Sequence, residues 1–241
     1  MRAAADLILP RRCLVCDRKL NLAERHLCLG CLADIPETRF WTVMHNPMAD
    51  RFNEAIQKHL EPADGPHEKY AYATALFYYD SHAGYRKVPY SIKYNGDIKA
   101  GKFFGKILGE RLAECQWLQD ADAIIPVPLH WSRKWKRGYN QAEVIASEVA
   151  SAMNIPLRTD ILRRIRPTRT QTKLKIDEKT KNVTDAFRAS SKDVGQFRHI
   201  ILVDDVFTTG STLMACFAAL RTVFPPSVRI SVATLAFVGG T

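Results

Sequence analysis

The pattern of apolar and polar positions along the chain predicts strands and helices in alternation. Alternation predicts a strand over residues 70–80, and short apolar runs predict buried strands at 122–127, 199–203 and 228–237. Three further segments carry apolar residues at a helical period: 101–118, 139–153 and 212–224. Because strands that alternate with helices form parallel sheets, the pattern predicts an α/β fold with a parallel sheet.

The segments before and between these elements predict the domain organisation. Residues 36–69 contain prolines, histidines and mixed polar stretches, which indicates a connector with a short helix over 52–59. Residues 159–166 are compatible with another strand. We expect three parts in chain order: a small N-terminal unit over 1–36, a connector over 37–69 and the α/β domain over 70–241.

Composition and charge narrow the kinds of partner that we expect for this protein. The chain has 241 residues, 46% of them hydrophobic, and a formal net charge of +10, which favours polyanionic partners. Residues 163–181 hold eight Lys or Arg against two acids, typical of a solvated loop or of a loop that closes over a phosphorylated ligand. No apolar run approaches the ~20 residues of a membrane span. The start of the chain does not resemble a signal peptide, so we expect a cytoplasmic protein with no membrane partner.

Four of the six cysteines form two CxxC pairs, Cys13 with Cys16 and Cys28 with Cys31. In a cytoplasmic protein such pairs indicate four thiolates around a tetrahedral zinc ion. Two disulfides are the alternative, which a reducing compartment disfavours. His26 lies close enough in the sequence to act as a substitute ligand. Four thiolates leave no open coordination position, so we expect a structural rather than a catalytic zinc.

The segment ILVDDVFTTGSTL places two acids at the predicted end of a buried strand. Ligands of open α/β sheets bind beyond the carboxyl ends of the strands, so we expect Asp204 and Asp205 to face a ligand. A hydroxyl-rich loop then enters a helix, whose first turn presents unpaired N–H groups suited to a phosphate. The loop residues are Thr208, Thr209, Gly210, Ser211 and Thr212. Acids repel phosphate, so we predict that they bind sugar hydroxyls or a divalent cation, and that the segment binds a ribose 5-phosphate.

Three alternative interpretations of this segment are weaker. A response-regulator receiver needs a phosphoacceptor aspartate further along the chain, but residues 206–241 contain no Asp or Glu. A P-loop needs a Gly-Lys-Ser/Thr ending, which residues 210–212 lack. An ordinary strand, turn and capped helix accounts for Ser211 or Thr212 but leaves two adjacent acids unexplained.

ILVDDVFTTGSTL closely resembles the phosphoribosyl-pyrophosphate (PRPP) signature of type I phosphoribosyltransferases. With the CxxC pairs, IIPVPLHWSRKWKRGYNQAEVIA and the TQTKL and NVTDAF segments, nearly the whole chain is similar to the ComF family. The resemblance implies a parallel-sheet type I phosphoribosyltransferase fold with a small N-terminal zinc ribbon held by four cysteines. It also implies binding of PRPP with Mg²⁺, and a role in natural transformation, where imported single-stranded DNA is handled in the cytoplasm.

The resemblance implies roles for individual residues. Asp204 and Asp205 contact the ribose hydroxyls, directly or through Mg²⁺, and residues 208–212 hold the 5-phosphate. The segment after Pro128 takes the place of the pyrophosphate loop, although it is longer and more basic than the loop of many type I enzymes. Residues 168–187 correspond to a flexible loop over the site. The groups expected to hold the departing pyrophosphate are Arg133, Lys134, Arg137 and Lys93.

The sequence leaves turnover open, because no residues indicate an acceptor substrate. A second hypothesis is a module that binds single-stranded DNA, in which aromatic rings stack on bases while Lys and Arg follow the phosphates. Its candidate residues are Trp131, Trp135, Lys136 and Tyr139. Packing of these aromatic rings against the sheet is the alternative. A third hypothesis is an adaptor in which the zinc ribbon docks a competence helicase and the PRPP pocket serves only as a ligand sensor.

Overall fold

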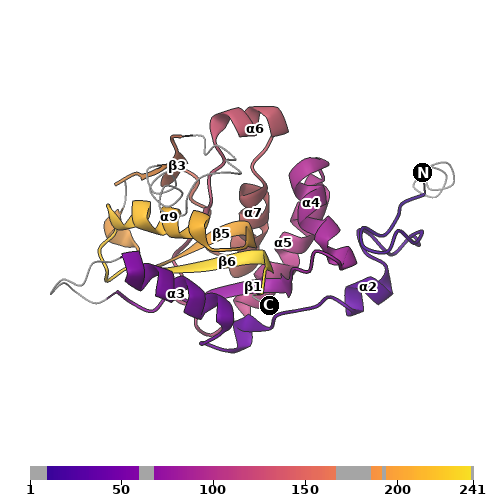
Figure 1. Ribbon diagram of the computed structural model, residues 1–241, viewed down its shortest axis with the longest axis horizontal. Coiled ribbons are helices and arrows are strands. Elements are labelled where there is room, and N and C mark those ends of the chain that lie inside the picture. The colour runs from indigo at the N-terminus through magenta and orange to yellow at the C-terminus, as the bar shows by residue number, and fades with distance from the viewer. Residues whose placement is uncertain (1–9, 60–67, 167–185, 192–193, 240–241) are drawn as a thin grey trace.

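A computed structural model describes residues 10–59, 68–166, 186–191 and 194–239. Its centre is a parallel four-stranded sheet of order β1-β6-β5-β2 (Figure 1), so the parallel sheet expected from the sequence is confirmed. The strands are β1 (Ala73–Tyr78), β2 (Ala123–Pro126), β5 (His199–Phe207) and β6 (Arg229–Phe237). A separate antiparallel pair consists of β3 (Leu162–Arg164) and β4 (Phe187–Ala189).

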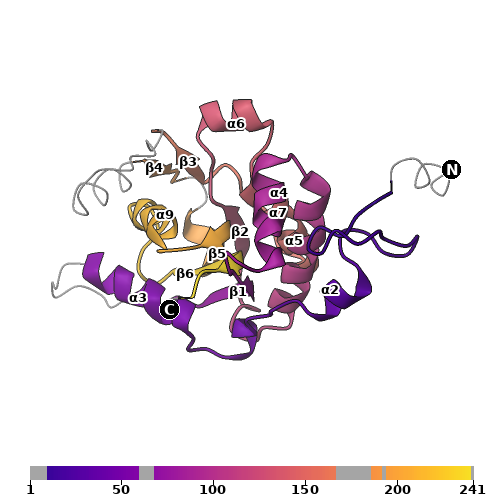
Figure 2. The ribbon, with the colours of Figure 1, turned by 45° about the vertical axis from the view of Figure 1, so that its right-hand side comes forward.

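Helices cover both faces of the sheet, as Figure 2 shows. One face is covered by α3 (Pro47–His59) and α9 (Ser211–Arg221). The other is covered by α4 (Lys87–Tyr94), α5 (Ile98–Ala113) and α7 (Gln141–Met153). Shorter helices are α2 (Leu29–Ala33), α6 (Trp131–Arg137), η1 (Phe40–Thr42), η2 (Gly84–Arg86) and η3 (Val194–Gln196). None of the described helices combines the length and apolar character needed to cross a bilayer.

Alternate residues of the central strand β5 pack against opposite helical layers. Ile200 and Leu202 lie in the apolar cluster shared with α3 and α9, whereas Ile201 and Val203 lie in the cluster shared with α5 and α7. A strand that is covered on both faces carries apolar residues in succession instead of in alternation. This is why β1, expected to alternate, has five buried residues in succession before its exposed last residue.

β5 is longer than the sequence predicts. The expected strand ends at residue 203, but β5 continues to Phe207 because β6 pairs with it along its whole length. Asp204 is aligned with Thr234 and Phe207 with Phe237. The two acids therefore lie inside the strand, near its carboxyl end, rather than at the open edge beyond it.

The segment after Pro128 forms a helix instead of an open loop. The side chain of His130 caps α6 by accepting the N–H of Ser132 at 3.3 Å, and Gly138 ends the helix with a left-handed φ of 85°. Asn140 then caps α7 by accepting the N–H of Ala142 at 3.2 Å, while its amide donates to the carbonyl of Val127 at 3.0 Å. The Arg-Gly-aromatic-Asn-Gln stretch thus joins two helices and ties them to the end of β2.

Candidate functional site

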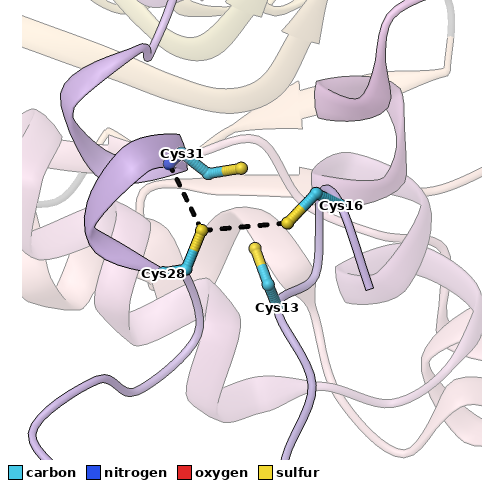
Figure 3. Close-up of side chains that lie close together, drawn as sticks. All are labelled: Cys13, Cys16, Cys28 and Cys31. Carbon is cyan, nitrogen blue, oxygen red and sulfur yellow. Dashed lines mark hydrogen bonds between the residues drawn. The ribbon is translucent and has the colours of Figure 1, made fainter. Parts of the chain in front are cut away.

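The four cysteines of the two CxxC pairs converge near the N-terminus (Figure 3). Their Sγ atoms all lie within 4.8 Å of one another, and none of the cysteines is in a disulfide. Burial raises the pKa of the Cys13 thiol, but backbone N–H groups of Cys16, Cys28 and Val15 outweigh it and lower the pKa to about 6. A donor set of four converging thiols fits a tetrahedral metal ion such as zinc. His26 is not among them.

We call the segment that carries the four cysteines, residues 12–31, the cysteine knuckle. Its first part forms a short hairpin. Arg12 bridges Lys19 in antiparallel fashion, and the N–H of Asp17 donates to the carbonyl of Cys13 at 2.9 Å. Asp17 takes a left-handed φ of 61°, which closes the turn between the first pair and the returning strand. The ring of His26, considered above as a substitute ligand, packs on Phe103 at 5.3 Å between centroids.

The knuckle is joined to the start of α4 by hydrogen bonds. The hydroxyl of Tyr85 donates to the carbonyl of Cys31 at 2.5 Å. Lys87 donates to the carbonyl of Val15 at 3.1 Å and to the carboxylate of Asp17 at 2.6 Å. The four-cysteine segment and the helix that carries Lys93 are therefore fixed to one another.

The acid pair of β5 is buried. Asp204 is 8% exposed and Asp205 is 4% exposed. One carboxylate oxygen of Asp204 accepts the N–H of Asp205 at 2.8 Å. Burial, and then the charge of Asp205, raise the pKa of Asp204 from 3.8 to about 8. Burial therefore disfavours a second negative charge at this pair.

One oxygen of Asp205 is both buried and incompletely partnered. Its Oδ2 accepts no hydrogen bond from the described residues. The ammonium of Lys93, at the end of α4, lies 3.6 Å from it. Lys93, which was expected to hold a pyrophosphate, therefore lies beside the acid pair.

Arg164 is a residue near this pair that sequence reasoning did not single out. Burial, and then the charge of Arg133, lower the pKa of the Arg164 guanidinium, while Asp204 opposes that shift. Its guanidinium also stacks over the ring of Phe187 at 5.1 Å. In the sequence Arg164 is one member of a long basic run, and no local pattern indicates that it lies within electrostatic reach of Asp204.

The hydroxyl loop lies between the end of β5 and the start of α9. Thr208, Thr209 and Ser211 are exposed, and the hydroxyls of the last two are 2.7 Å apart. Gly210 precedes the helix with a left-handed φ of 78°, so it offers no side chain to cap the first N–H groups. Arg51 of α3 donates to the carbonyl of Thr208 at 3.1 Å and fixes the start of the loop.

The basic candidates after Pro128 lie on α6 and contact neighbouring helices. Lys134 pairs with Glu143 at 3.1 Å, and Arg137 donates to Gln141 and stacks over the ring of Tyr94 at 5.8 Å. These contacts give both residues a structural role within the α4, α6 and α7 region. The expected loop over the site, residues 168–187, lies almost entirely outside the described residues.

Exposed aromatic rings gather on α4 and α6, and we call Tyr90, Tyr94, Trp131 and Trp135 the aromatic face. Trp131 is 72% exposed and Trp135 is 88% exposed, so packing of Trp135 against the sheet is wrong. Tyr90 and Tyr94, which the sequence did not single out, are also exposed and lie 4.9 Å apart between ring centroids. Tyr139 differs, because its hydroxyl donates to the carbonyl of Ile92 and its ring is partly buried.

Comparison with known proteins agrees with this arrangement. Residues 140–238, which include β5, the hydroxyl loop, α9 and β6, match the family described as "Phosphoribosyl transferase domain". The match and the parallel sheet show a phosphoribosyltransferase-like domain. The chain is also 43% identical over 101 residues to "Competence protein F" of Haemophilus influenzae, covering 42% of this chain and 44% of that protein. These similarities support a ComF-like protein with a phosphoribosyltransferase-like domain, and the four-cysteine cluster lies near its N-terminus.

Other similarities are more limited. The chain is 38% identical over 96 residues to "DNA utilization protein YhgH" of Escherichia coli O157:H7, covering 40% of this chain and 41% of that protein. It therefore spans less than half the length of these curated relatives. Among solved structures it is similar to a glutamine PRPP amidotransferase from B. subtilis complexed with ADP and GMP. That likeness has a TM-score of 0.37 and 20% identity over 54% of this chain and 26% of the other, too little to bear on function.

Proposed function

We propose that this protein binds ribose 5-phosphate ligands, PRPP among them, at the carboxyl end of β5. The observation that carries the proposal is the buried Oδ2 of Asp205, which accepts no hydrogen bond from the described residues. A buried carboxylate oxygen is costly to leave without a donor, and a sugar hydroxyl supplies one. The loop after β5 has exposed hydroxyls, and it leads into the first turn of α9. Both features are suited to bind a phosphate.

We propose further that the protein acts in the uptake or use of DNA. Support comes from the names of its relatives, "Competence protein F" and "DNA utilization protein YhgH". The formal net charge of +10 suits a partner with a phosphate backbone.

Titration calorimetry with PRPP tests the ligand proposal. Replacing Thr209 and Ser211 together by alanine removes two exposed hydroxyls from the loop, so we expect binding to weaken by about tenfold. Ser151→Ala removes an exposed hydroxyl from α7 and serves as the matched control. Equal dissociation constants for the wild type, the double variant and the control would mean that the phosphate binds elsewhere. Release of pyrophosphate on addition of candidate acceptors then measures turnover separately.

The aromatic face supports a second candidate function, the binding of single-stranded DNA. Tyr90 and Tyr94 form an exposed pair of rings tilted at 43° to each other, and the guanidinium of Arg137 lies over Tyr94. Exposed rings next to Lys and Arg side chains are typical of surfaces that stack nucleobases and follow a phosphate backbone. Sequence-independent binding of this kind needs no ligand at the acid pair.

Fluorescence anisotropy with a labelled oligothymidylate tests this second function. We expect Trp135→Ala to weaken binding by about fivefold to a hundredfold, the range for loss of one stacking ring. Lys136→Ala measures the electrostatic contribution to DNA binding. Lys58→Ala, on the distant α3, is the control for this variant. The double change Asp204→Asn with Asp205→Asn leaves DNA binding intact if the aromatic face acts alone. Equal affinity of wild type and Trp135→Ala would exclude the face as the DNA site.

A further inference from the structure

The acid pair is a poor donor set for the Mg²⁺ ion that the family resemblance implies. Mg²⁺ takes six oxygen ligands in a near-octahedral array and usually keeps several waters. Asp204 and Asp205 are 8% and 4% exposed, and one oxygen of Asp204 is already bonded to the N–H of Asp205. Both carboxylates are almost entirely covered by protein, so a hydrated ion has little room beside them. The residues present do not fit a directly coordinated divalent ion.

A cation of the protein itself already lies at the pair. The Nζ atom of Lys93 is 3.6 Å from Oδ2 of Asp205. The Lys93 side chain is 37% exposed and that of Asp205 is 6% exposed, so the ammonium reaches from the surface to a buried oxygen. A divalent ion bound to this oxygen would lie beside the ammonium, and like charges at such a separation repel strongly in a partly buried site.

The helix that carries Lys93 is held at both ends. At its first turn Lys87 bonds to Val15 and Asp17 of the cysteine knuckle. At its last turn the carbonyl of Ile92 accepts the hydroxyl of Tyr139. The position of the ammonium is thus set by the framework of the molecule. Lys93 also lies outside the residues 140–238 that match the phosphoribosyltransferase family.

We propose that the Lys93 ammonium takes the place of a divalent cation at the acid pair, so that this site binds the ribose of a sugar phosphate without a divalent metal ion. The inference rests on the proposed binding of ribose 5-phosphate. Lys93 lies 3.6 Å from Oδ2 of Asp205, offsets negative charge at the pair and leaves carboxylate oxygens to accept ribose hydroxyls. It acts as a positioning residue.

Calorimetry of the wild-type protein with ribose 5-phosphate gives the first test. This probe is preferred to PRPP because it lacks the pyrophosphate that binds Mg²⁺ in solution. The protein is first shown to retain its zinc, and is then titrated in metal-free buffer and in buffer with millimolar Mg²⁺. We expect the two dissociation constants to agree within about twofold, because a ligand and a metal that do not share a site are not linked. Binding that requires Mg²⁺ keeps the proposed function and overturns the role of Lys93. Failure to bind in both buffers overturns the proposed function, and this inference with it.

Substitutions at Lys93 give the second test. Lys93→Met removes the charge and is expected to weaken binding in metal-free buffer by about tenfold or more. Millimolar Mg²⁺ is not expected to restore the affinity of this variant, because the two carboxylates are as covered in the variant as in the wild type. Lys93→Arg keeps the charge and should remain independent of metal. Lys102→Met, at an exposed position of α5, is the control. Equal affinity of wild type and Lys93→Met for ribose 5-phosphate in metal-free buffer would refute the inference.

Discussion

Gly210 meets two separate demands of the loop between β5 and α9. Its φ of 78° lies in the left-handed region that residues with a side chain rarely adopt. A Cβ atom there would lie 2.8 Å from Cζ of Phe207, whose own side chain is buried in the sheet. Backbone and packing therefore both select glycine.

We predict that Gly210→Ala lowers the free energy of unfolding by on the order of 1–3 kcal/mol, because the strained φ and the close contact add. Urea denaturation measures the change. Gly195→Ala is the control, since a Cβ there meets no atom within 4 Å and the backbone is not left-handed. Equal stability of the two variants would show that the loop relaxes without cost.

The raised pKa of Asp204 predicts how the stability of the protein changes with pH. Its pKa is raised from 3.8 to about 8, so between these values the folded protein binds a proton that the unfolded chain has released. The free energy of unfolding therefore falls as pH rises through this window. Asp204→Asn has no proton to lose, so its stability should fall less between about pH 5 and pH 8.

Urea denaturation at both pH values compares the variant with wild type. Asp34→Asn, at an exposed aspartate, is the control and should follow the wild-type profile. Parallel profiles for Asp204→Asn and wild type would mean that Asp204 is ionised throughout.

At the scale of elements, the contact between α5 and α7 depends on glycines spaced four residues apart. Gly101, Gly105 and Gly109 lie on one face of α5, and a Cβ on any of them would come within 3.0 Å of α7. At Gly109 the nearest atoms include Cα of Val149 at 2.9 Å, which is backbone and cannot turn away. The two helices can approach this closely only because α5 lacks side chains there.

We predict that Gly109→Ala destabilises the protein by about 1–3 kcal/mol, although alanine normally favours a helix over glycine. Gly101→Ala is the matched comparison, because its nearest atom is the Cγ1 of Val144, at 3.0 Å on a side chain. We expect a net change of under about 1 kcal/mol there, since the gain in helix propensity offsets the contact. Thermal denaturation of both variants shows which of them is less stable. A larger loss of stability in Gly101→Ala than in Gly109→Ala would refute this role of the glycines.

At the scale of the whole molecule, the cysteine knuckle shares its apolar core with the helical layer. Cys13, Leu20 and Leu27 belong to the same buried cluster as Phe104 and Leu108 of α5. Two hydrogen bonds from Lys87 strengthen the connection. The knuckle and the sheet domain are therefore expected to unfold together, although the sequence suggests separate units.

We predict that removing the metal with a chelator lowers the melting temperature of the entire protein, because metal binding contributes directly to the folding free energy of such clusters. Differential scanning calorimetry should show one transition that shifts to lower temperature, and Cys13→Ser should reproduce the shift. Cys216→Ser, at a buried cysteine outside the cluster, should lower stability without altering zinc content. A second, separate transition that leaves the main one unchanged would show an independent N-terminal domain.

The sequence by itself determined the features that depend on near neighbours. The CxxC spacing predicted the convergence of Cys13, Cys16, Cys28 and Cys31, and the order of apolar runs predicted the parallel sheet. Periodicity located α7 within two residues of its start and at its end, residue 153. These signals are local, because turns, caps and amphipathic faces are set by a few adjacent side chains.

Only the tertiary structure decided what surrounds the acid pair. Pairing with β6 extends β5 and draws Asp204 and Asp205 into the interior. Packing of α4 on the sheet brings Lys93 to Asp205, and the fold of α6 exposes Trp135 while it buries part of Tyr139. Each of these contacts joins segments far apart in the chain. No pattern within one segment encodes which distant side chain will meet a given carboxylate, since that depends on how whole elements pair and pack.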